Sequence, residues 1–151
     1  MRSETLYGGP ISGLLARWPL ARVLMLILAG AFLGLMTDIR VEHVDIVRET
    51  PVAWTPIVYS AAMAVACIVA AFLWNSAARL VMRIGFLVAF VVGGLGFYFH
   101  NRGHFGDVIT GSVSAWFDSQ MEHPGGPPHT APLAFAGLGL LGGVATLRRF
   151  N

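Results

Sequence analysis

The chain contains no lysine, and charged residues of any kind are scarce. All ten basic residues are arginine, and with eight acidic residues they bring the charged fraction of the 151-residue chain to only 12%. A soluble domain carries about twice that fraction. The arginines adjoin apolar segments instead of gathering in a polar stretch, which disfavours a nucleic-acid-binding protein and favours membrane topology as their explanation.

Cysteine pairs and the common catalytic motifs are also missing. Cys67 is the single cysteine, which excludes a disulfide framework and thiol–disulfide chemistry within one chain. The sequence has no HExxH or CxxC motif and no G-x-S-x-G around its serines, so that neither a zinc protease nor a serine hydrolase is indicated. No charged residue lies near the middle of an apolar segment, which disfavours a proton-coupled carrier.

Long apolar stretches, by contrast, are abundant, and hydrophobic residues make up 56% of the chain. A membrane-spanning helix needs about 20 mostly apolar residues, and the stretches 18–36, 56–74, 78–99 and 131–147 approach that length. The sequence therefore predicts an all-α integral membrane protein, with one four-helix bundle over residues 1–151. A cleaved signal peptide is the alternative interpretation of the first stretch, but no clear cleavage site follows it.

Arginine and acidic residues separate onto opposite ends of these helices. The two terminal segments, together with the starts of the first and third stretches, hold seven arginines and a single acidic residue, Glu4. The segments 37–55 and 100–130 hold three arginines and seven acidic residues. Because arginine-rich loops stay in the cytoplasm, we expect a multi-pass protein of the cell inner membrane with both termini cytoplasmic and both of those segments extracytoplasmic. The interfacial aromatics agree: Trp18 and Trp74 inside, and Trp54, Tyr98 and Trp116 outside.

Local patterns add three expectations about packing. The short turn at 75–76 predicts that the second and third helices form a tight antiparallel hairpin. Apolar positions within 108–121 recur at helical spacing, which predicts a short amphipathic helix in the outer interface. Small residues let helices approach closely, and packing within the bundle is favoured over a dimer face. These residues are Gly30 with Gly34, Gly139 with Gly143, and the stripe Ala62, Ala66 and Ala70. The glycines at 93, 94 and 96 are expected to loosen the outer half of the third helix or to admit a neighbour's side chain.

All five histidines fall in the two outer segments, together with most of the acidic residues. His100 and His104 are four residues apart, so that an extension of the third helix would present both imidazoles on one face. Imidazole with carboxylate suits zinc, copper or iron. The candidate metal ligands are His100, His104, His43, Asp45, Asp107, His123 and His129. The competing interpretation, ordinary interfacial histidines, is the favoured one.

The sequence therefore leaves several functions open, and it does not decide whether the protein is an enzyme. The first hypothesis is an accessory or assembly subunit of a larger membrane complex, in contact with the lipid bilayer and with a membrane-protein partner or a second copy. The alternative is a metal-binding protein, whether a metalloenzyme or a haem-binding protein. Haem is disfavoured because, of the five histidines, only His100 lies at helical depth. Sensing of pH by the same histidines is a third possibility.

Overall fold

The computed structural model describes residues 18–42, 48, 51–101 and 132–147, and these residues are almost entirely helical. The α-helices are α2 (Leu20–Glu42), α4 (Trp54–Phe72), α5 (Ser76–Asn101) and α8 (Leu133–Ala145). A 3-10 turn, η1 (Pro51–Ala53), leads into α4. No strand occurs in these ranges, and the predicted all-helical class is confirmed for them.

Three of the four helices are long and apolar enough to cross a membrane, namely α2, α4 and α5. The fourth is shorter than its predicted range of 131–147: α8 has 13 residues, or roughly 20 Å at 1.5 Å per residue. A bilayer core is about 30 Å thick. Pro132 stands at the N-cap of α8, and the chain leaves the helix at Thr146, so both ends lie inside the predicted limits.

The other three helices extend beyond their predicted ends on the side of the segments 37–55 and 100–130, which corrects the bounds of those segments. At their opposite ends α2 begins two residues later, and α4 ends two residues earlier, than predicted. Because neither glycine nor proline interrupts 37–42, α2 continues past Met36, and the Thr37 hydroxyl donates a hydrogen bond to the Leu33 carbonyl at 3.0 Å. α5 continues to Asn101. Residues 37–42, 54–55 and 100–101 are therefore helical instead of belonging to loops.

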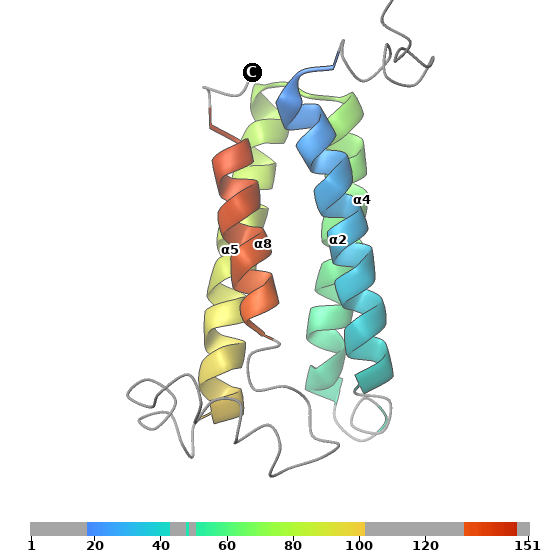
Figure 1. The fold of residues 1–151 in the computed structure, drawn as a ribbon, viewed down its shortest axis with the longest axis vertical. Helices are drawn as coiled ribbons and strands as arrows, with labels where there is room; N and C mark the ends of the chain where they lie inside the picture. The colour runs from blue at the N-terminus through green and yellow to red at the C-terminus, as the bar shows by residue number, and fades with distance from the viewer. Residues whose placement is uncertain (1–17, 43–47, 49–50, 102–131, 148–151) are drawn as a thin grey trace, which may run out of the picture.

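The helices run alternately up and down and pack as two pairs, α2 with α4 and α5 with α8 (Figure 1). This corrects the expected hairpin of α4 and α5. These two helices are antiparallel and joined by the short turn at 73–75, where Asn75 Oδ1 accepts the Ala78 N–H at 2.9 Å. Each of them nevertheless packs mainly on its other neighbour, with only slight contact between the two.

Glycines explain why α5 and α8 lie so close together. A Cβ added at Gly93 of α5 would lie 2.4 Å from the backbone nitrogen of Ala136. A Cβ added at Gly139 of α8 would lie 2.5 Å from the backbone nitrogen of Phe90. Both distances are far below normal contact, so the two backbones touch only because these positions lack side chains.

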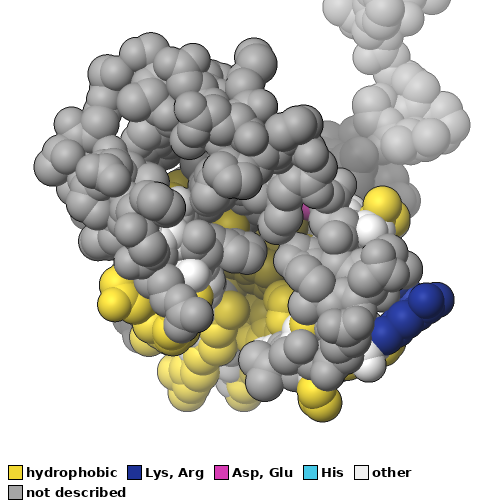
Figure 2. All heavy atoms as spheres, turned by 90° about the horizontal axis from the view of Figure 1, so that it is seen from below, with side chains coloured by type: hydrophobic (Ala, Val, Ile, Leu, Met, Phe, Trp, Pro, Cys, Tyr) yellow, Lys and Arg dark blue, Asp and Glu magenta, His cyan; other side chains and the backbone are white. Residues whose placement is uncertain are grey.

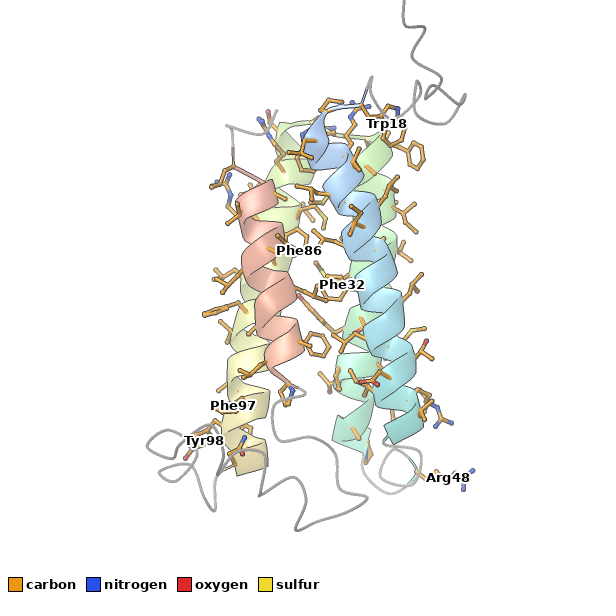
Figure 3. All side chains as sticks on the ribbon, in the orientation of Figure 1. Trp18, Phe32, Arg48, Phe86, Phe97 and Tyr98 are labelled. Carbon is orange, nitrogen blue, oxygen red and sulfur yellow. The ribbon has the colours of Figure 1, made fainter. Side chains whose placement is uncertain are left out.

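Aromatic side chains fill the space between the two pairs. Phe32 of α2 and Phe86 of α5 point toward each other between the pairs (Figure 3). Together with Tyr59 of α4 and Phe135 of α8 they form one group, in which neighbouring ring centroids lie 6.1 to 6.5 Å apart. The Tyr59 hydroxyl also donates a hydrogen bond to the Gly85 carbonyl. Rings of this size hold the backbones of the two pairs apart, which accounts for the slight contact between α4 and α5.

The predicted small residues differ in whether they lie at a contact between helices. Packing within the protein is confirmed for Gly139, whereas an added Cβ at Gly143, Gly30 or Gly34 meets nothing within 4 Å. Gly142 takes the place expected of Gly143, because an added Cβ there would lie 2.2 Å from the Phe86 ring. Of the alanine stripe only one member, Ala70, is fully buried.

Candidate functional site

The two histidine-bearing segments are attached to the same end of the helices. α2 and α5 finish there, at Glu42 and Asn101, and the chain re-enters there at Pro51 and Pro132 (Figure 1). We call this the loop end. The opposite end, where α2 and α5 begin, carries Arg22, Arg79 and Arg83 and is called the arginine end. The antiparallel order of the helices produces this separation.

The predicted metal ligands fall almost wholly outside the described residues. His100 lies in the last turn of α5, but its side chain is among those left undescribed. α5 does pass Phe99, as a shared face for two imidazoles requires, yet it is described only to Asn101. Outside the described ranges lie His43, Asp45, His104, Asp107, His123, His129 and the expected interfacial helix at 108–121. Within them, no group of three histidine, cysteine or acidic side chains comes together.

The outer surface of the helices is the most prominent feature of the described residues. Large hydrophobic side chains are exposed along all four helices. Figure 2, an end-on view from the loop end, shows hydrophobic side chains in yellow where the described helices are visible. Leu87 is 62% exposed and Val65 is 61% exposed. A continuous exposed apolar surface of this kind requires either hydrocarbon or an apolar protein partner around it.

Aromatic side chains flank this surface at both ends. Trp18 lies at the arginine end and Tyr98 at the loop end (Figure 3). Trp74, in the turn between α4 and α5, is also at the arginine end, and Trp54, at the start of α4, is at the loop end. Trp18 packs edge-on against Phe72 with ring centroids 5.5 Å apart. Tryptophan and tyrosine favour the level of lipid headgroups, where a ring meets hydrocarbon and its polar atom meets water.

Polar groups inside the helical packing are few and enclosed. Ser60 is fully buried, and its hydroxyl has no hydrogen-bond partner among the described atoms. Asn101 is also buried, and its Nδ2 donates to the Phe97 carbonyl at 2.8 Å. Cys67 is a free, buried thiol. Because Ser60 and Cys67 are both enclosed, neither is presented to a substrate as a nucleophile.

Arg83 of α5 binds the C-terminal end of α8, a contact that sequence reasoning missed. Its Nη2 donates to the Thr146 carbonyl at 3.1 Å, and its Nε lies 3.5 Å from the Thr146 hydroxyl. The guanidinium thereby supplies a donor, and a positive charge, at the C-terminal end of α8, where helix carbonyls lack partners. The two residues are far apart in the sequence, and no local pattern joins them. The sequence indicated only that Arg83 belongs on the cytoplasmic side.

A comparison with family models, curated proteins and solved structures finds no match to this chain. Its function is therefore argued from its own residues.

Proposed function

We propose that the chain is a membrane-inserted bundle of four helices that serves as a non-enzymatic accessory or assembly subunit of a larger membrane complex. The supporting observation is the exposed apolar surface along α2, α4 and α5, each of which is long enough to cross a bilayer. Their backbone groups are paired within the helices, as hydrocarbon demands.

The fourth crossing is assigned to α8 together with its flanking residues. On one side α8 is covered by α5, whose Gly93 and Gly139 contacts bring the two backbones together. On the other it exposes Leu140, Leu141 and Val144. Thr146 at its end is held by Arg83 at the arginine end, and Pro132 at its start packs beside Gly96. A short helix supported in this way can cross where a locally thinned bilayer or flanking residues cover the difference.

The accessory role is supported by a closely packed interior and an apolar outer surface among the described residues. Their interior is occupied by packing: the four central aromatics, the glycine contacts between α5 and α8, and the small residues of α4. Away from the helix ends, and apart from Arg83, the exposed side chains of α2, α4 and α5 are apolar. The described residues thus present an apolar surface for lipid and for neighbouring transmembrane helices, which is how small membrane subunits are bound.

The test is the mass of the protein in native lipid. Membranes containing the untreated complex are solubilised with an amphipathic polymer, and the particles are analysed for protein mass and composition. We expect the 16.2 kDa chain in constant stoichiometry with at least one other membrane protein, and loss of that protein when the chain is deleted. Particles that contain only a single copy of the chain would rule out the accessory role.

A second candidate, a metal site at the loop end, is favoured by one observation. Segments 43–50 and 102–131 are attached at the same end of the helices, and the candidate ligands His43, His100 and His104 all belong to the sequence at or beyond that end. Metal analysis of protein purified without a histidine tag tests it. We expect one equivalent of a transition metal, lost in the double variant His100→Ala/His104→Ala and retained in Asp38→Asn. Metal below stoichiometry in the parent protein would eliminate this candidate.

A further inference from the structure

Among the described residues, the arginine end holds positive charge without any negative side chain beside it. Arg22, Arg79 and Arg83 are the charged residues that the structure describes there. The acidic residues within the described ranges, Asp38 and Glu42, both lie in the last turns of α2 at the loop end. The guanidinium groups of the arginine end are therefore not neutralised by any described carboxylate.

Arg22 is the most unusual of the three. It lies in the first turn of α2, where its backbone N–H bonds to the Pro19 carbonyl at 2.9 Å. Its side chain is half-buried, and its Nε is shielded from solvent without any hydrogen-bond acceptor among the described atoms. Because an enclosed guanidinium N–H without an acceptor is costly, this group calls for an anionic acceptor from outside the described protein.

The other two arginines differ in how far they are already engaged. Arg83 is committed to the end of α8 through the Thr146 carbonyl. Arg79 makes one long hydrogen bond, 3.4 Å from its Nη2 to the Ser76 hydroxyl. Most of the donors on Arg79 thus have no acceptor among the described atoms, since a guanidinium has five donors. Among the arginines described at this end, Arg22 and Arg79 are therefore the ones whose N–H donors can bind an external anion.

We propose that Arg22 and Arg79 bind the phosphates of anionic phospholipid headgroups at the arginine end. Guanidinium matches phosphate in charge and geometry and forms paired hydrogen bonds with it. The proposal rests on the membrane insertion proposed above, because the headgroup must lie at the level of these residues. Trp18 and Trp74 at this end are consistent with that level.

Apolar side chains beside each arginine favour a lipid over free phosphate. Leu20, close to Arg22, is 54% exposed, and Leu80, next to Arg79, is 57% exposed. Phe72, at the end of α4, is also exposed. A phospholipid satisfies both features at once, since its phosphate meets the guanidinium while its acyl chains cover the exposed leucine. Inorganic phosphate satisfies only the first.

The experiment measures thermal unfolding of the purified chain in neutral detergent with three additions: phosphatidylglycerol, phosphatidylcholine and inorganic phosphate. We expect phosphatidylglycerol alone to raise Tm, with an effect that weakens as salt is added. The double variant Arg22→Gln/Arg79→Gln should need at least about tenfold more phosphatidylglycerol for the same shift, since a charged hydrogen bond contributes on the order of 1.5 kcal/mol or more. The matched control Arg40→Gln/Arg48→Gln removes two arginines outside the arginine end and should respond like the parent.

Each outcome is decisive. The proposal is contradicted if phosphatidylcholine or inorganic phosphate raises the Tm of the parent chain as much as phosphatidylglycerol does. This comparison uses the parent chain alone and does not depend on whether the variants fold. An unchanged lipid response in the Arg22/Arg79 variant contradicts it as well. Membrane insertion is checked separately by alkaline carbonate extraction. A chain released by carbonate overturns insertion itself, whereas a retained chain without headgroup preference overturns only the lipid site.

Discussion

Single residues decide how closely the helices of this protein approach one another. Gly93 and Gly139 lie where the α5 and α8 backbones touch, whereas Gly30, Gly34 and Gly143 face open space. All five are glycines in apolar helices, and nothing in the sequence distinguishes the GxxxG pair of α2 from the GxxxG pair of α8. The sequence showed that close packing was available, but only the relative rotation of the helices selects the residues that use it.

Replacing Gly139 with alanine tests this close approach. The new Cβ would meet the backbone of Phe90, which cannot move without moving α5, so we expect Gly139→Ala to lower the free energy of unfolding by about 1–3 kcal/mol. Gly137→Ala is the matched control in the same helix, since its Cβ meets nothing within 4 Å. The control should be neutral or slightly stabilising because alanine favours helix. Reversible unfolding in mixed micelles measures both, and equal effects would contradict the assigned packing.

Tyr59 combines a hydroxyl and a ring whose contributions can be separated. Tyr59→Phe removes the hydrogen bond to the Gly85 carbonyl and should cost about 0.5–1.5 kcal/mol. Tyr59→Ala also removes the ring from its contacts with Phe32 and Phe135 and should cost about 3–5 kcal/mol. The same unfolding assay compares the two variants. If the phenylalanine variant loses as much stability as the alanine variant, the ring does not fill the space between the helix pairs.

At the scale of whole elements, the sequence predicted which segments are helical better than where they end or what they pack on. Apolar runs at 18–36, 56–74 and 78–99 lie largely within α2, α4 and α5. The ends differ because residues such as Thr37 and Arg40 are polar yet compatible with helix, and α2 continues through them. The pairing of α4 with α2 depends on long-range shape and could not be obtained from the short turn that joins α4 to α5.

The end of α8 depends on a residue from another helix. Arg83→Gln removes the charged donor to the Thr146 carbonyl, so we expect faster amide hydrogen exchange at Thr146 and Leu147 and a loss of stability of about 0.3–1 kcal/mol. Arg79→Gln is the control, one turn earlier on α5, and should leave exchange at those amides unchanged when no anionic lipid is present. Unaltered protection in Arg83→Gln would show that α8 ends without help from α5.

At the scale of the molecule, two tightly packed helix pairs are joined through a central group of aromatic rings. Phe32 contacts the other three, Tyr59, Phe86 and Phe135. It is also fully buried. Direct contact between the backbones of the two pairs is slight, so these rings carry much of the cohesion between them. The ligands of the expected metal site lie outside the described residues apart from the backbone of His100, so that site stays a prediction from the sequence.

Removing the central ring should loosen one pair from the other. We expect Phe32→Ala to lower stability by about 3–5 kcal/mol and to broaden the distance distribution between spin labels placed on α2 and α5. The neighbouring Leu33 is 44% exposed, and Leu33→Ala serves as the control that should leave the distribution narrow. Equal distributions in the two variants would mean that other contacts join the pairs.

The central proposal is that four helices cross the membrane, with the loop end outside the cytoplasm as the distribution of arginines in the sequence predicts. Single cysteines introduced by Ser3→Cys, Glu49→Cys, Ser114→Cys and Asn151→Cys in a Cys67→Ala background can be labelled in intact cells with a membrane-impermeant maleimide. The account predicts labelling at positions 49 and 114, and at positions 3 and 151 only after the membrane is permeabilised. Labelling of positions 49 and 114 from opposite sides of the membrane would contradict it.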